Sequence, residues 1–397
     1  MKRYRVILLF LLFHSYFVQA QVNSWTQLAD FPANARTTAS TFVVGNSAYV
    51  VAGYDGTNFK KSLYRYFAPL NSWDAMPDLP GMPRNIAVAF SIGTKGYIGT
   101  GQGASAFSYD FWEYDTNLEV WTQKANFMGA GRSGAVGGAA NGKGYIGLGQ
   151  GSSGFLTDWW QYDPATNAWT AKANFAGSGR RMASCFVINS IIYVACGDDF
   201  HYKKDLWAYD AANDTWTAKA DFGGTARHSC VCYSIGNKGY LGTGYDSTLH
   251  FKKDMWEYNA ITNSWAQITD YGGTAREGAI AFTIGTVSYI GLGYDTSCRK
   301  DMWRYIPSAP AGITNPSADK LTIYPNPVTS EALVELSKVE PNTHLEIYNL
   351  LGSMVLSSAI DNNKVPINLT NMPSGNYLVC IKNNTGVTLL SKSLTKQ

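Results

Sequence analysis

The chain has 397 residues, enough for two or more domains, and 14% of them are aromatic while 39 are glycines. This composition favours many short strands joined by tight turns. The 32 basic and 29 acidic residues nearly balance. The chain therefore lacks the large positive net charge that would indicate a nucleic-acid partner.

Residues 1–20 have the features of a signal peptide. Lys2, Arg3 and Arg5 precede the apolar run 6–13, and the segment ending at Ala20 has the small-residue pattern that signal peptidase cuts. The run is too short to span a bilayer, and no later segment has about 18 uninterrupted apolar residues. We therefore predict an exported chain without a transmembrane segment, whose mature form begins at Gln21.

A tryptophan recurs every 47 to 49 residues, and an arginine follows each one eleven positions later. The tryptophans are Trp25, Trp73, Trp121, Trp169, Trp216 and Trp265. The arginines are Arg36, Arg84, Arg132, Arg180, Arg227 and Arg276. A fixed period of this length indicates a supersecondary unit that must stack on copies of itself.

Each repeat has four segments with strand character. In the third repeat, two apolar runs, 135–140 and 145–149, flank a Gly/Asn turn, which predicts a hairpin. A variable loop leads to the aromatic strand 160–162, and an Asp/Asn-rich turn leads into the next tryptophan strand. We predict a four-stranded antiparallel meander for each unit.

This pattern resembles kelch repeats over residues 25 to 306, although Gly-x-Gly stands where the family has a glycine pair. The resemblance implies blades of a β-propeller. The chain enters at the strand of Trp25 and leaves after the aromatic strand 303–305, so five complete units and two complementary pieces predict six blades. We expect an all-β, six-bladed propeller spanning 21–306 that is closed by the N-terminal strand.

The composition changes after the propeller. Residues 307–319 form a Pro- and Ala-containing linker, and six short alternating strands between 321 and 393 predict a small β-sandwich at 320–397. The motifs Tyr324-Pro325-Asn326-Pro327 and Gly375-Asn376-Tyr377, with the tail 392–396, resemble the C-terminal sorting domain of the type IX secretion system of Bacteroidetes. The resemblance implies that 320–397 engages the type IX machinery and that the product is secreted or displayed on the cell surface.

The candidate binding face carries the loops that enter the first strand and those that join the second and third strands. The repeated arginines begin the innermost strands there, and Lys-Lys or Arg-Lys pairs with neighbouring aromatics lie in the other loops. The positions directly after the arginines differ between repeats, so they are better candidates for specificity: Thr37, Asn85, Ser133, Arg181, His228 and Glu277. The face is expected to bind an anionic or carbohydrate ligand, such as an acidic glycan or peptide. Candidate contacts are Arg36, Arg84, Arg132, Arg180, Arg181, Arg227, His228, Arg276, Glu277, His201, Tyr202 and His250.

Structural interpretations stand beside these. The identical arginines can serve the scaffold by bonding loop carbonyls between blades, the lysine pairs can be solvated turns, and the regularly spaced Asp110, Asp158, Asp205, Asp254 and Asp301 can cap loops. Cys185, Cys230 and Cys232 fill positions that hold small residues in other repeats, which favours inert buried thiols over a disulfide bridge between neighbouring blades.

Enzyme chemistry has weaker support in the residues. The propeller's histidines His201, His228 and His250 lack a metal-ligand spacing, so no metal or other cofactor is predicted. Kelch propellers also include copper radical oxidases, whose long insertions are absent, and sialic acid mutarotases, for which Glu277 with Arg181 and His228 could supply acid/base groups. A secreted binding or adhesion module is therefore the main hypothesis. A sugar-active enzyme and a scaffold for another surface protein remain alternatives.

Overall fold

The computed structural model describes residues 23–307, 321–339, 341–349, 354–383 and 388–397. The predicted signal peptide and most of the predicted linker lie outside these ranges. Nearly all regular structure is β, with one 3-10 turn, η1 (Ala68–Leu70). No helix in the described parts is long and apolar enough to cross a membrane.

Residues 24–306 fold into six four-stranded antiparallel sheets, the blades. Blade 1 contains β2 (Ser40–Val44), β3 (Ser47–Val51), β4 (Leu63–Phe67) and β5 (Ser72–Met76). Blade 2 contains β6 (Val88–Ile92), β7 (Lys95–Gly99), β8 (Phe111–Asp115) and β9 (Val120–Gln123). Blade 3 contains β10 (Val136–Ala140), β11 (Lys143–Gly147), β14 (Trp159–Asp163) and β15 (Ala168–Lys172).

The remaining blades repeat this plan. Blade 4 contains β16 (Ser184–Ile188), β17 (Ile191–Ala195), β18 (Leu206–Asp210) and β19 (Thr215–Lys219). Blade 5 contains β21 (Val231–Ile235), β22 (Lys238–Gly242), β24 (Met255–Asn259) and β25 (Ser264–Ile268). Blade 6 contains β26 (Ile280–Ile284), β27 (Val287–Gly291), β28 (Met302–Ile306) and β1 (Ser24–Gln27). Two-residue pairs lie in the loops of blades 3 and 5: β12 (Gln150–Gly151) with β13 (Gly154–Phe155), and β20 (Arg227–His228) with β23 (Tyr245–Asp246).

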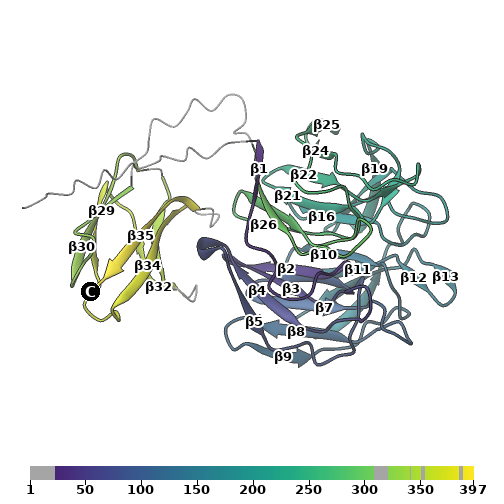
Figure 1. Cartoon of the computed structure of the whole chain (residues 1–397), viewed down its shortest axis with the longest axis horizontal. Helices are drawn as coiled ribbons and strands as arrows, with labels where there is room; N and C mark the ends of the chain where they lie inside the picture. Colours follow the sequence, from purple (N-terminus) through teal and green to yellow (C-terminus); the bar gives the residue numbers. More distant parts are fainter. Residues whose placement is uncertain (1–22, 308–320, 340, 350–353, 384–387) are drawn as a thin grey trace, which may run out of the picture.

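The N-terminal strand closes the ring, as predicted. β1 pairs antiparallel with β28, with Trp25 opposite Tyr305, and Figure 1 shows purple β1 beside the green strands of the last blade. The innermost strands contact one another in the cyclic order β2, β6, β10, β16, β21, β26 and back to β2. The ring is therefore complete. Because β1 supplies the fourth strand of blade 6, the edge of β28 is paired.

The repeated tryptophans hold neighbouring blades together. Trp121 packs on Tyr114 of its own blade, with 4.9 Å between ring centroids, and its indole nitrogen donates to the carbonyl of Pro77 at 2.8 Å. Close packing also explains small residues inside strands: a Cβ on Gly96 would lie 2.1 Å from the ring of Phe42 in the preceding blade. The period seen in the sequence thus reports contacts between blades.

Two closed circles of backbone hydrogen bonds join the blades at the loop face. In the first, the glycine that follows the second strand of each blade donates to the carbonyl of the next blade's repeated arginine, from Gly53 to Arg84 and finally from Gly293 to Arg36, at 2.7 to 2.9 Å. In the second, the inner ring, each residue two positions after the arginine donates to its counterpart in the preceding blade. The inner ring contains Thr38, Ile86, Gly134, Met182, Ser229 and Gly278, all with positive φ.

The central channel lies behind the inner ring. Its cavities, of about 310 and 320 Å³, are lined by the small residues of the innermost strands together with Cys185 and Cys232. Cys230 also lines the second cavity, and the cysteines of the described residues are all free thiols. Burial raises the pKa of Cys185 and raises that of Cys232 to about 12, which keeps both thiols protonated.

The C-terminal residues form the predicted β-sandwich. One sheet has the order β29 (Leu321–Tyr324), β30 (Glu331–Leu336) and β33 (Lys364–Asn368). The other has the order β32 (Met354–Ala359), β31 (His344–Asn349), β34 (Gly375–Lys382) and β35 (Thr388–Lys396). The sequence did not predict β33, because Pro366 interrupts its pattern, yet an edge strand tolerates proline. Val334, Leu345 and Val379 belong to the common core.

Candidate functional site at the loop face of the propeller

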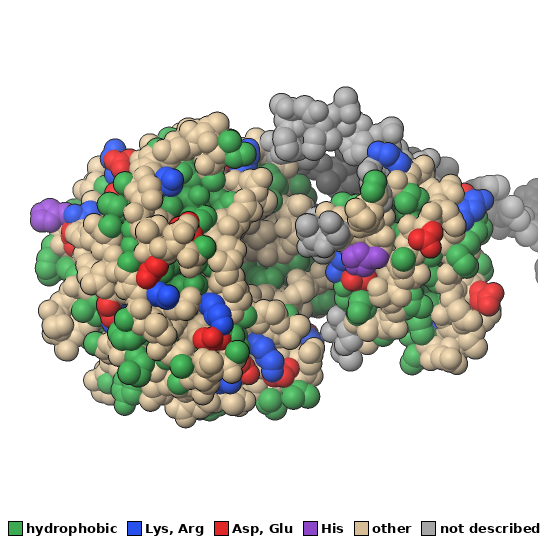
Figure 2. All heavy atoms as spheres, turned by 180° about the vertical axis from the view of Figure 1, so that it is seen from behind, with side chains coloured by type: hydrophobic (Ala, Val, Ile, Leu, Met, Phe, Trp, Pro, Cys, Tyr) green, Lys and Arg blue, Asp and Glu red, His purple; other side chains and the backbone are tan. Residues whose placement is uncertain are grey.

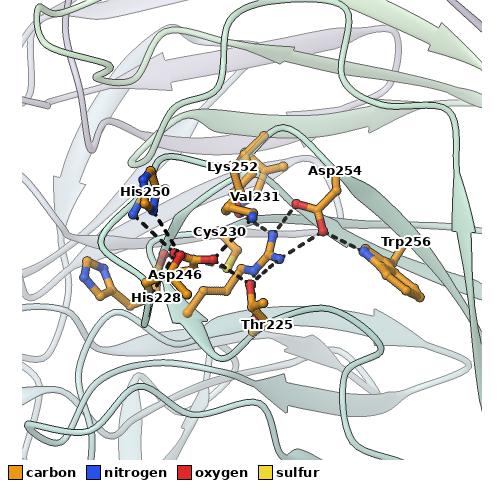
Figure 3. A network of polar contacts seen from close by, with 12 residues as sticks. Thr225, His228, Cys230, Val231, Asp246, His250, Lys252, Asp254 and Trp256 are labelled. Atoms are coloured by element: carbon orange, nitrogen blue, oxygen red, sulfur yellow. Dashed lines mark hydrogen bonds and ion pairs between the residues drawn. The ribbon is translucent and has the colours of Figure 1, made fainter.

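The six repeated arginines are buried in the scaffold. Their exposed fractions are 0 to 2%, so the prediction that they contact a ligand directly is wrong for the folded chain. In blade 2, Arg84 Nη1 and Nη2 lie 2.5 and 2.6 Å from the carboxylate oxygens of Asp110, and Trp112 donates to the same carboxylate at 2.7 Å. Figure 3 shows the corresponding Asp254 and Trp256 in blade 5. The same pairing joins Arg132 to Asp158, Arg180 to Asp205, Arg227 to Asp254 and Arg276 to Asp301.

These pairs correct two further expectations. The repeated aspartates are partners of the arginines instead of loop caps, and the carbonyls that Arg84 binds, those of Met82 and Thr100, belong to its own entry loop and its own blade. Burial by itself would raise the pKa of Asp110, but the hydrogen bonds and charge of Arg84 lower it below its usual value. The pair is therefore ionised and serves to fix the entry loop onto the third strand.

Blade 1 lacks this ion pair, and three positions change together. Compared with the other blades, Ser62 stands in place of the aspartate, Tyr64 in place of the tryptophan and Ala33 in place of a glycine. Arg36 binds the hydroxyl of Ser62 at 3.0 Å. In blade 2 a Cβ on the equivalent Gly81 would lie 2.5 Å from both the Asp110 carboxylate and the Arg84 guanidinium. A methyl group is thus compatible with this position where the aspartate is absent.

The first member of each basic pair in the variable loops forms an ion pair with a carboxylate of its own loop. Lys203 pairs with Asp199 at 2.8 Å and Arg299 with Asp295 at 2.6 Å, and Lys60 pairs with Asp55. On the face shown in Figure 2, blue and red side chains lie beside one another instead of separating by sign. The expected concentration of positive charge at the loop face is therefore largely offset.

The mouth of the channel is built from three positions in each blade. The residue after the arginine forms a β-bridge with the residue after the glycine that ends the second-strand run, and that residue in turn bridges a third one farther along the loop. The first positions are Thr37, Asn85, Ser133, Arg181, His228 and Glu277. The second are Tyr54, Gln102, Gln150, Asp198, Tyr245 and Tyr294, and the third are Phe59, Phe107, Phe155, Tyr202, Phe251 and Cys298. Since each inner-ring residue follows a first position and precedes the channel lining, the inner ring separates the mouth from the channel.

The first positions of blades 1 to 3 are used structurally. Thr37 donates to the carbonyl of Gly278 at 3.2 Å, Asn85 donates to the hydroxyl of Thr38 at 3.1 Å, and Ser133 is buried. Specific chemistry is therefore concentrated in the sector of blades 4 to 6.

In that sector the first positions carry ionisable groups. Arg181 binds Gln150 at 2.7 Å and lies 3.3 Å from Asp198. His228 Nδ1 lies 2.9 Å from the Ser229 hydroxyl and 3.6 Å from a carboxylate oxygen of Glu277. Burial lowers the pKa of His228 and raises that of Glu277, so both groups favour their neutral forms more than in water.

Rings line this sector without a break. Centroid distances are 4.8 Å from Tyr202 to His228, 5.9 Å from His228 to Tyr245, 5.2 Å from Tyr245 to Phe251 and 6.0 Å from Phe251 to Tyr294. We call these five residues the aromatic arc. Tyr202 and His228 were predicted contacts, whereas Tyr245, Phe251 and Tyr294 were not, although the position after Gly-x-Gly in blades 5 and 6 was a visible signal.

The other two candidate histidines lie apart from the arc. His201 has a side chain that is 87% exposed and is 3.9 Å from Asp199, while His250 lies 3.1 Å from the Thr248 hydroxyl. Figure 3 shows His250 on the loop that contains Asp246. Among the described residues, no cluster of three or more His, Cys, Asp or Glu side chains is arranged to hold a metal ion.

Comparisons with known proteins agree with this architecture. Residues 179–223, which include all four strands of blade 4, match the kelch motif, and residues 322–396 match the secretion system C-terminal sorting domain. The chain thus combines a β-propeller that contains a kelch motif with a C-terminal sorting domain of a secretion system. It carries a type IX sorting domain, which directs it to the cell surface or the medium.

A solved structure titled "Structure of YjhT" resembles the chain with a TM-score of 0.61 and 15% identity, covering 69% of this chain and 95% of that one. At this identity the likeness shows the fold alone. In all, 722 chains of solved structures match significantly, so the fold by itself selects no function. No curated protein matches the chain significantly.

Proposed function

We propose that the protein is an extracellular binding module that recognises carbohydrate at the propeller mouth. The aromatic arc is the observation that carries the proposal. Sugar rings present flat faces of C–H groups that pack on aromatic side chains, and these side chains contribute large contact areas with few rotatable bonds.

Polar groups beside the arc supply the directional contacts that such a site needs. Arg181 offers guanidinium donors, Glu277 a carboxylate and His228 a ring nitrogen, while the hydroxyl of Tyr202 lies on the same arc. Arg181 also gives the mouth a partly exposed cation for a sugar carboxylate, although Asp198 shares it. His201 and His250, one on each neighbouring loop, are outer contacts in this proposal.

A glycan array followed by calorimetry on the full-length protein tests the proposal. Tyr245→Ala should weaken binding of the selected glycan about tenfold, a change of about 1.4 kcal/mol, because it removes the central ring of the arc. Ile261→Ala is the control, since Ile261 is 82% exposed in a third-to-fourth-strand turn on the opposite face. Equal affinities of the Tyr245 variant and the wild type would refute the site.

The alternative that the site favours is a sugar-active, mutarotase-like enzyme. Glu277 and His228 lie 3.6 Å apart, and burial shifts the pKa of each group toward its neutral form, in which a carboxyl group donates a proton and an imidazole accepts one. Ring opening and closing of a sugar hemiacetal requires such a pair. Anomer exchange measured by NMR should then stop in Glu277→Gln while glycan affinity is kept; exchange that persists in this variant would exclude Glu277 as the acid/base group.

A further inference from the structure

A pocket lies between the loops of blades 4 and 5, and none of its lining residues belongs to the aromatic arc. Its volume is about 580 Å³, and its walls include Lys204, Thr225, Lys252 and the indole of Trp256. Figure 3 shows Lys252, Asp254, Trp256 and Thr225 around this region. We call it the rim pocket.

Small residues of the entry loop form one wall of the rim pocket, where the backbone packs closely on the indole of Trp256. Gly223 and Gly224 form part of the wall, and a Cβ on Gly223 would lie 2.4 Å from the Trp256 ring. Blades 1 to 4 carry Pro32, Pro80, Met128 and Ala176 at the position of Gly223. The contact between backbone and indole is therefore not repeated in those four blades.

The pocket lining has more basic than acidic side chains: Lys204, Arg227 and Lys252 against Asp254. Asp254 already binds Arg227 and Trp256. Lys252 forms an ion pair of 3.3 Å with Asp246, which also accepts hydrogen bonds from Thr225 and Thr248. Lys203 pairs with Asp199, whereas its neighbour Lys204 has no ion pair with a carboxylate in the described part of the chain, so Lys204 is the lysine that is available to an anion.

The blade 5 loop connects the rim pocket to the aromatic arc. Phe251 bridges Tyr245 and belongs to the arc, whereas its neighbour Lys252 lines the rim pocket. Successive residues of an extended segment point to opposite sides, which explains how one loop serves both surfaces. A chain of sugars that stacks on the arc can therefore cross this loop and place a substituent between the two lysines.

We propose that the rim pocket binds an acidic substituent, a sulfate or carboxylate group, of a glycan that continues from the mouth. Lys204 and Lys252 hold the anion, and Trp256 packs against the sugar that bears it. This proposal rests on the carbohydrate-binding function of the mouth, and it adds the acidic class of glycan and the place where the acid is recognised.

The test compares dextran sulfate with uncharged dextran as probes, using the full-length protein and calorimetry at fixed ionic strength. The double variant Lys204→Gln/Lys252→Gln should bind dextran sulfate at least tenfold more weakly than the wild type and leave any dextran binding unchanged. The charge-matched control is Lys60→Gln/Lys61→Gln, which removes two neighbouring lysines from the blade 1 loop, outside the rim pocket. Thermal unfolding of both variants checks that the fold is retained.

The outcomes separate the rim pocket from the mouth. Equal losses in the two double variants would show nonspecific charge attraction, and absence of dextran sulfate binding by the wild type would refute the proposal. If the protein bound polyglutamate in a way that depends on Lys204 and Lys252, but did not bind dextran sulfate, the ligand of the pocket would be an acidic protein and the glycan proposal would be refuted. Dextran sulfate binding that depends on the two lysines but is unchanged in Tyr245→Ala would support the rim pocket as an anion site and refute carbohydrate binding at the mouth.

Discussion

The buried pair of Arg84 and Asp110 gives a quantitative test of the scaffold. In Asp110→Ala the guanidinium of Arg84, which is fully buried, would keep only carbonyl partners, those of Thr100 and Met82, and the Trp112 indole would lose its acceptor. Breaking a buried ion pair costs about 3–5 kcal/mol. Because the Asp110 side chain is 22% exposed and water can enter, we expect the lower end, about 3 kcal/mol.

Blade 1 supplies the matched control. Ser62→Ala removes a single hydroxyl at the equivalent position and should cost about 1 kcal/mol. Thermal unfolding followed by circular dichroism should show a Tm lower by roughly 6–12 °C for Asp110→Ala and by a few degrees for Ser62→Ala. If the two substitutions lowered Tm equally, Asp110 would not be compensating a buried charge, and its role in the scaffold would be a different one.

Three other predictions follow from the same contacts. The pKa values of four aspartates that pair with arginines are lowered in the folded state: Asp110, Asp158, Asp205 and Asp254. The stability that these carboxylates contribute is therefore complete above their pKa in the unfolded chain, about 4, and is lost as the pH falls further. Urea unfolding should show a steep loss of stability below about pH 4, and a flat profile there would contradict the prediction. Deleting residues 22–31 removes β1 and the packing of Trp25 on Tyr271 and Tyr305, so the cooperative melting transition should disappear. The control is Gln27→Ala in the same strand, which should melt like the wild type. Cys185 and Cys232 should react with an aromatic disulfide reagent at pH 8 only after unfolding, as read by mass mapping of the labelled peptides; rapid labelling of the native protein would show that the channel is open to the reagent.

Much of the architecture was readable because repeats restate the same physical problem six times. The 47-to-49-residue period located the blades, and the incomplete first and last units predicted that Trp25 would complete blade 6. The first repeat also has Ala33 in place of the glycine and Ser62 in place of the aspartate. This correlated change is visible in the sequence alone, and it is a signal from which the Arg–Asp partnership could have been inferred.

The candidate site was less readable. Repetition alone did not say which way Arg84 points, because its carboxylate partner stands 26 positions later and is brought beside it only when the third strand folds back. The ion pairs of the loop lysines and the contacts within the aromatic arc depend in the same way on loop geometry. Tyr202 contacts His228 across two blades, although 26 residues separate them in the chain.

The sequence by itself determined the all-β fold, the ring closure and the sorting domain, since these follow from periodic local patterns and from residues close together in the chain. The tertiary structure alone decided that the repeated arginines are buried scaffold and that the ionisable groups of blades 4 to 6 share one mouth. The physical reason is that burial and ion pairing depend on which side chains from different strands and blades fill the same space, and a linear pattern does not specify that.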